Sequence, residues 1–291
     1  EAGTLSLLAG RIKNPLGIYN ETRDVAFTRP GVFVPQEVYF DKVRNLVMSS
    51  DGVALGATWH PRDLNIDLHL AVAQPRVDEN VEAGFLGQVW QGELDPQGLS
   101  YVANLSIATP AERLRTGFSL ASTKLRFSPG PADLLPRGDI DILYTITSVQ
   151  YLAGPFTFTA EYMREPVEWK GFVSSPFANA STVAEGYYFQ TQWQANERLE
   201  LMLRYGEAYA DRSDRSGRRA EKISGAFLPA HSRYSRIVAI GARWDFSPSL
   251  MLQAEFQHHD GSFILSTREN PRPDLIDPDW TLFALSLSYR F

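Results

Sequence analysis

The stretch from Asp279 to Phe291 reads DWTLFALSLSYRF and repeats at a period of two. Successive side chains of a β-strand point to opposite faces of the sheet. One parity carries apolar and aromatic residues after its first position: Thr281, Phe283, Leu285, Leu287, Tyr289 and Phe291. The other is small or polar over most of its length: Trp280, Leu282, Ala284, Ser286, Ser288 and Arg290. The stretch therefore predicts a strand with one continuous apolar face.

The same alternation recurs along the whole chain and predicts eleven further strands. Their approximate ranges are 4–13, 52–60, 65–72, 99–108, 114–127, 138–151, 156–162, 187–194, 199–206, 234–246 and 250–259. In 114–127 and 138–151 the parity slips partway, which is typical of a β-bulge.

Short and long connections alternate between these predicted strands. The short ones carry Pro, Asn, Asp or Gly, which favour tight turns. The long ones lie near 14–51, 75–98, 128–137, 170–182, 210–232 and 260–278. No helical pattern of the length needed for a βαβ crossover separates the strands. The pattern therefore predicts an antiparallel up-and-down meander.

The composition excludes several classes of protein. The chain has 291 residues, of which 44% are hydrophobic and 12% aromatic, too many for a disordered chain. It has no cysteine, which excludes disulfides, thiolate metal sites and cysteine nucleophiles. Its formal net charge of −6 argues against nucleic acid as the main partner. The best candidate for a membrane helix, residues 142–160, is interrupted by Gly154 and Pro155.

A soluble β-sandwich also alternates, but two features favour a membrane barrel. Charges and amides crowd the polar parity, while Tyr and Trp lie near strand ends on the apolar parity, as in the aromatic girdles of barrels with a wet interior. The alternation of short and long links matches periplasmic turns and extracellular loops. Because lipid cannot bond free backbone groups, only helices and closed barrels span it.

The C-terminal pattern resembles the signature of Gram-negative outer-membrane β-barrel proteins. That signature is a terminal aromatic residue with aromatic and apolar residues at alternate positions before it. The matching positions are Phe283, Leu285, Leu287, Tyr289 and Phe291. The segment from Ala9 to Gly31 also resembles a strand and loop of bacterial porins. The resemblance implies recognition by the outer-membrane assembly machinery and a place in the bacterial outer membrane.

We therefore expect residues 1–291 to form a single transmembrane β-barrel domain. Twelve strands are visible, and the segment 4–13 begins in mid-pattern. The chain is then either a twelve-stranded barrel or the C-terminal part of a sixteen-stranded one with a wider lumen.

The charged residues of the polar parity are the pore-lining candidates. They are Asp67, His69, Arg115, Glu161, Arg204, Arg243, Glu255 and Arg290. Such charges either solvate a water-filled lumen and pair with one another, or set a field that filters solutes. Both signs occur, so the count alone favours neither anions nor cations.

The connection 14–51 is the candidate constriction element, because long ordered loops are often functional. Its aromatic residues would let it fold inward, and its charges would then face the pore. These charges are Arg23, Asp24, Arg29, Asp41, Lys42 and Arg44. The alternative is a surface loop that caps the barrel. Residues 39–51 would form a short helix or begin the second strand.

The leading hypothesis is a porin that lets small hydrophilic solutes or ions diffuse passively, with no cofactor or metal and no enzymatic activity. The usual motifs of hydrolases, metalloproteases and nucleotide-binding proteins are absent from the sequence. A docking barrel that sheathes a partner subunit is the alternative. An outer-membrane hydrolase built on His258 is a further one. Expected partners are the lipid bilayer, lipopolysaccharide near the basic loop 211–222, the assembly machinery, and further copies of the chain.

Overall fold

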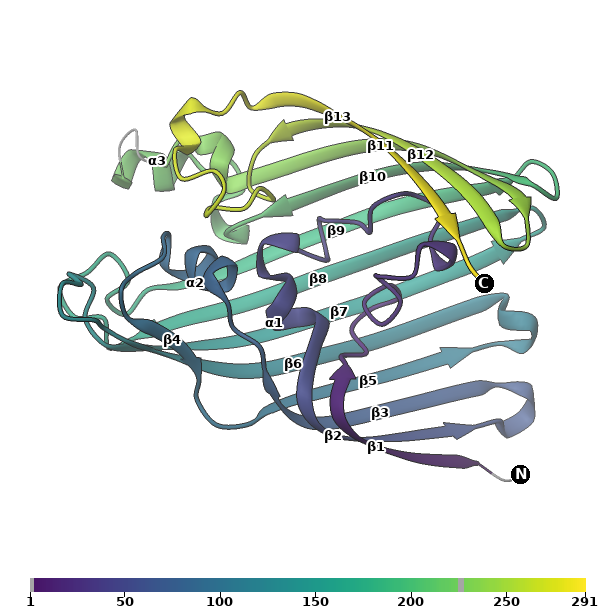
Figure 1. Ribbon diagram of the computed structural model, residues 1–291, viewed down its shortest axis with the longest axis horizontal. Helices are drawn as coiled ribbons and strands as arrows, with labels where there is room; N and C mark the ends of the chain where they lie inside the picture. The colour runs from purple at the N-terminus through teal and green to yellow at the C-terminus, as the bar shows by residue number, and fades with distance from the viewer. Residues whose placement is uncertain (1–2, 225–227) are drawn as a thin grey trace.

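The computed structural model describes residues 3–224 and 228–291, and its core is one antiparallel meander. Each of twelve strands pairs with its neighbour in the chain (Figure 1). They are β1 (Thr4–Lys13), β2 (Ser49–Trp59), β3 (Asn65–Pro75), β5 (Ser100–Ala108), β6 (Leu114–Ser128), β7 (Gly138–Ala153), β8 (Phe156–Lys170), β9 (Ser181–Gln194), β10 (Leu199–Tyr209), β11 (Tyr234–Ser247), β12 (Leu250–Gly261) and β13 (Asp279–Tyr289). The predicted meander is confirmed.

Several short elements lie in the long connections. They are α1 (Arg44–Met48), α2 (Glu79–Leu86), α3 (Arg218–Ser224) and the four-residue β4 (Glu93–Pro96), which extends the sheet by pairing with β6. The sequence left residues 39–51 open between a helix and the start of a strand. The segment contains both a helix and the start of a strand, because α1 ends at Met48 and β2 begins at Ser49.

The sequence predicts β-bulges in β6 and β7, where the alternation of apolar and polar residues slips. The pairing of these two strands shows no bulge, so the slip has another cause. Pairing between these strands runs without a shift from Leu114↔Tyr151 to Phe127↔Gly138. The inward positions of β7 near its loop end are apolar, among them Ile140 and Ile146, which are fully buried. They pack under other parts of the chain, so the inner face stops being polar there. A register shift does occur in β11, between Asp245 and Ser247.

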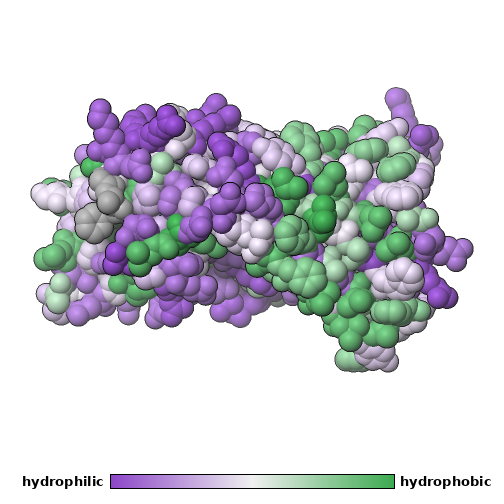
Figure 2. Space-filling view, turned by 90° about the horizontal axis from the view of Figure 1, so that it is seen from above, coloured by the Kyte–Doolittle hydropathy of each residue, from purple (hydrophilic) through white to green (hydrophobic). Residues whose placement is uncertain are grey.

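The convex face of the sheet is apolar and exposed. Leu203, Leu285 and Leu287 are 56%, 62% and 68% exposed, whereas Gln253 and Glu255 on the other face are at most 1% exposed. Figure 2 shows hydrophobic residues gathered over the strands and hydrophilic ones over the long-loop end. This arrangement is the reverse of a soluble domain, in which apolar side chains are buried.

The sequence predicts a polar, water-filled interior, but the concave side is polar along only part of its length. Near the long loops it holds an apolar cluster, in which Leu16, Val38 and Phe40 pack with Ile140 and Met163 of the sheet. Apolar side chains therefore fill part of the concave side near the long loops.

The sheet curves strongly but its two edges do not meet (Figure 1). Within the described residues, β1 pairs only with β2, and β13 only with β12. No helix in this part of the chain is both long and apolar enough to cross a membrane.

Candidate functional site: the inward loop and the cavity beside it

The connection between β1 and β2 (residues 14–48, here the inward loop) lies against the concave face of the sheet (Figure 1). Near its start, the Gly17 amide donates to Ser119 Oγ of β6 at 2.8 Å. Further along, the Phe33 amide donates to Glu255 Oε2 of β12 at 3.0 Å. The loop thus contacts strands on both sides of the trough.

Glu161 of β8 is the main polar anchor of the inward loop. Its carboxylate accepts from Tyr39 Oη at 2.5 Å and from the Ile18 amide at 2.9 Å, both in the loop. It also accepts from Ser148 Oγ at 2.5 Å and from Tyr188 Oη at 2.8 Å, both in the sheet. Charge-assisted bonds to a buried carboxylate are among the stronger hydrogen bonds. The two bonds from the sheet orient the carboxylate, and the two bonds from the loop therefore fix the loop's position.

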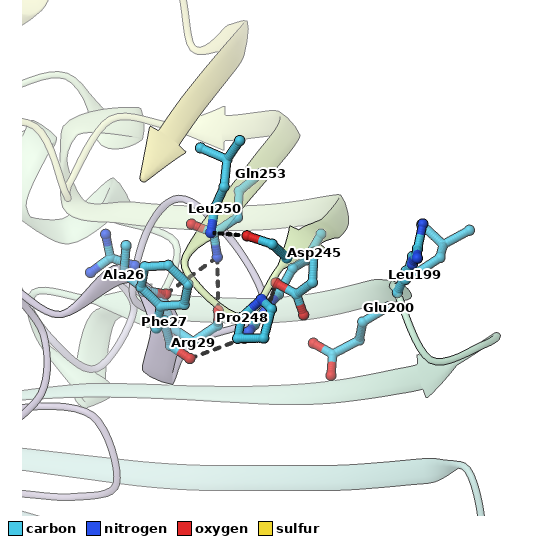
Figure 3. A network of polar contacts seen from close by, with 12 residues as sticks. Ala26, Phe27, Arg29, Leu199, Glu200, Asp245, Pro248, Leu250 and Gln253 are labelled. Carbon is cyan, nitrogen blue, oxygen red and sulfur yellow. Dashed lines mark hydrogen bonds and ion pairs between the residues drawn. The ribbon is translucent and has the colours of Figure 1, made fainter. Parts of the chain in front are cut away.

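A second anchor lies on β10 and β12. Arg204 Nη2 pairs with Glu255 Oε1 at 2.9 Å, and both side chains are almost fully buried. Beside them, Gln253 Nε2 donates to the carbonyls of Arg29 at 2.8 Å and Gly31 at 3.1 Å (Figure 3). A Cβ at Gly31 would lie 2.4 Å from Glu255 Oε2, so a larger residue there would displace the Glu255 side chain.

A cavity of about 300 Å³ lies between the inward loop and the sheet, toward the short turns. Figure 3 shows Phe27 and Arg29 of the loop on one side of this region and Glu200, at the start of β10, on the other. The lining is mostly polar: Ile18, Tyr19, Thr22, Phe27, Thr28, Arg29, Pro30, Arg115, Gln150, Gln192, Glu200 and Arg243.

The eight pore-lining candidates all lie on the concave parity of the sheet, but they divide into three groups. Arg115 and Arg243 line the cavity. Glu161, Arg204 and Glu255 are buried and hold the inward loop. The others lie elsewhere on that face: Asp67, which accepts from Thr58 Oγ1 at 2.7 Å, His69 on β3, and Arg290, which donates to the Pro248 carbonyl at 2.7 Å.

Of the six charged loop candidates, only Arg29 lines the cavity. Arg23 is buried and donates to Asp41 Oδ1 at 2.5 Å, so this pair folds the loop onto itself. Lys42 Nζ donates to the Phe263 carbonyl at 2.7 Å. Asp24, which pairs with Lys13, and Arg44 are exposed. The expectation that all these charges face the pore is therefore wrong, because several of them serve the loop's own fold.

The cavity is also lined by polar residues that the sequence analysis does not predict as pore-lining. Gln150, Gln192 and Glu200 belong to the polar parity of their strands, and that parity was the available signal. Tyr19, Thr22 and Thr28 come from the inward loop, whose path no periodicity reveals.

The C-terminal residues Phe283, Leu285, Leu287, Tyr289 and Phe291 are all exposed, the first four along the outer face of β13. His258 is also on the outer face, 3.4 Å from Asp279, and its cross-strand neighbours are Val238 and Thr281. No serine is placed beside it among these partners. Within the described residues, no cluster of three or more His, Asp or Glu is arranged to hold a metal ion.

The up-and-down antiparallel sheet, with its apolar convex face and inward loop, is the fold of bacterial outer-membrane β-barrels. Two solved structures that match nearly the whole chain are OmpT of Vibrio cholerae and a Salmonella typhi OmpF complex with daunomycin. The first has a TM-score of 0.56 at 10% identity, over 99% of this chain and 76% of that one. The second has a TM-score of 0.56 at 12% identity, over 99% of this chain and 74% of that one.

An anion-selective porin from Comamonas acidovorans also matches, with a TM-score of 0.53 at 10% identity. The match covers 88% of this chain and 63% of that porin, so the chain spans less than two thirds of its length. No protein-family model and no curated protein sequence matches. At these identities the likeness establishes the fold alone.

Proposed function

We propose that the protein is a porin of the bacterial outer membrane, through which small hydrophilic solutes or ions diffuse passively. The observation that carries the proposal is the polar cavity beside the inward loop, on the concave side of a sheet whose outer face is apolar. A lipid-facing apolar surface around a polar interior is the arrangement that lets water and solutes cross a bilayer.

The inward loop gives the proposed passage its narrowest part. Its anchors on Glu161 and Glu255 hold it across the concave face rather than over the barrel mouth. Selectivity in such a passage follows from its width and from the charges that line it. Passive diffusion involves no chemical reaction and therefore requires no cofactor and no catalytic residue.

Planar-bilayer recording of the purified full-length protein tests this proposal. We expect discrete conductance steps that persist without any added partner. The double variant Tyr39→Phe/Glu161→Gln, which removes hydrogen bonds from the loop anchor, should conduct more or fluctuate more between levels. A folded, inserted protein that never conducts would contradict the proposal.

One observation favours the second candidate, a docking barrel that binds a partner subunit. The apolar cluster and α2 occupy the long-loop part of the concave side, where Val81 and Leu86 are buried. A barrel plugged in this way would not conduct, and it would copurify with a tightly bound partner.

A further inference from the structure

The charges that line the cavity are unequal. Arg29, Arg115 and Arg243 contribute three positive charges, and Glu200 is the one acidic residue of the lining. Just beyond the lining, Asp245 lies 3.1 Å from Arg243, and the Arg290 guanidinium lies 4.8 Å from the Phe27 ring centroid. Including both neighbours leaves the same excess of positive charge. This local excess contrasts with the formal net charge of −6 for the whole chain.

The other pore-lining candidates that are acidic, Glu161, Glu255 and Asp67, lie outside the lining of this cavity. Glu161 accepts four hydrogen bonds under the inward loop, and Glu255 is paired with Arg204. Asp67 lies on β3 and accepts from Thr58. The carboxylates nearest the loop therefore serve to hold it, while the arginines are directed to the cavity.

Two of the three arginines keep their charge available to a solute. Arg29 donates to backbone carbonyls, those of Arg23 and of Gly31 at 3.3 Å, which carry no net charge. Arg115 has neither an ion pair nor a side-chain hydrogen bond within the described part of the chain, and its cross-strand neighbours are Ala108 and Gln150. Arg243 is shared between Asp245 and the Phe27 carbonyl. Gln150 and Gln192 also line the cavity, and their amides donate to Thr159 Oγ1 and Glu200 Oε1.

We propose that this cavity is an anion filter, in which Arg29, Arg115 and Arg243 favour small anions such as chloride, carboxylates and phosphate over cations. The inference rests on the proposed porin function, for which it names the class of solute. Positive charge in a narrow passage with low-dielectric walls raises the local concentration of anions. Guanidinium groups are also suited to the planar oxygens of carboxylates and phosphates.

The reversal potential in a potassium chloride gradient across a planar bilayer tests this assignment. We expect the parent protein to pass chloride in preference to potassium. Arg115→Gln should lower the permeability ratio by up to about sevenfold, because one unit charge about 7 Å away in water changes the chloride and the potassium terms by about threefold each, in opposite directions. Arg115→Glu should lower it further, and Glu200→Gln should raise it. Arg113→Gln is the matched control, because Arg113 is exposed in the turn before β6 and does not line the cavity.

Selectivity that follows this order, with Arg113→Gln unchanged, supports the filter. A conducting protein that prefers potassium, or whose ratio ignores Arg115 and Glu200, overturns the filter while the porin function stands. A protein without any conductance overturns both. Raising the salt concentration should weaken the preference in the parent protein, since exposed charges are screened over about 10 Å at 0.1 M.

Discussion

Buried polar residues of the inward loop are tied to partners far away in the sequence. Glu37 is fully buried, and its carboxylate lies 3.9 Å from Arg204 Nε. Burial raises the pKa of Glu37, and Arg204 opposes that rise. A buried charge without a partner is far more costly than a paired one. Arg204 therefore serves two carboxylates at once, Glu37 of the loop and Glu255 of the sheet.

Lys42 gives the loop a dependence on pH. Its ammonium lies 3.4 Å from the Phe263 ring centroid, and Arg233 and Glu165 face it from other elements. Burial lowers the pKa of Lys42 to about 7, whereas a free lysine has a pKa of about 10.4. The undocked loop thus binds a proton in this window that the docked loop does not. Docking should be strengthened as pH rises from 7 toward 10, by up to about tenfold per pH unit.

Limited proteolysis of the folded protein in detergent checks this expectation. Cleavage within residues 36–48 should be slower at pH 9.5 than at pH 7, after correction for the protease's own pH profile. In Lys42→Met the difference should vanish. Equal protection of the parent loop at both pH values would show that Lys42 does not titrate on docking.

Single elements were predictable from the sequence where the alternation of apolar and polar residues continues over many residues. Most ends of the twelve strands lie within a few residues of the predicted ends. Two strands are longer than predicted, because β8 continues to Lys170 and β9 begins at Ser181. The strand β4 was missed because four residues carry too little alternation, and α2 was missed because it has only eight. The apolar inner positions of β7 were misread, since a strand covered on both faces does not alternate.

Glycine on β9 determines how closely the inward loop approaches the sheet. A Cβ at Gly186 would lie 1.8 Å from the Glu37 carbonyl oxygen. Gly186→Ala should therefore push the loop off the sheet, with faster proteolysis of residues 14–48 and an altered conductance. Gly117→Ala is the matched control, because a Cβ there meets its nearest atom at 3.7 Å, an ordinary contact. If both variants behave like the parent, backbone packing against Gly186 does not hold the loop.

The whole molecule turns its apolar face outward, and this was predictable from the parity of side chains. The site was predictable only in part. Alternation places Arg115 and Arg243 on the inner face, but it cannot show that Glu161 and Glu255 bind the loop instead of lining the cavity. That division depends on the fold of residues 14–48, which have no period. The charge of Arg29 made it a predictable candidate, whereas Thr22 and Thr28, which line the same cavity, carry no such signal.

A charge on the outer face tests the orientation of the sheet in lipid. Leu203 lies on β10, 56% exposed, between strands on both sides. Leu203→Arg should lower the free energy of unfolding in lipid vesicles by about 2–4 kcal/mol if the residue lies near the bilayer midplane. Gln192→Arg, on the concave face, should have a much smaller effect. Urea titration monitored by tryptophan fluorescence gives both values, and an equal effect of the two substitutions would contradict the assignment of faces.

The inward loop leaves the sheet after the first strand, yet its partners Arg243, Gln253 and Glu255 follow more than 200 residues later. Contacts of such high sequence separation form late, because the entropy of closing so long a stretch of chain must be lost first. The loop therefore finds its place only after the last hairpins have been added. A newly made chain would expose Leu16, Val38 and Phe40 until then, so the closing stages of assembly, rather than the first hairpins, determine whether the inward loop and the cavity beside it are correctly formed.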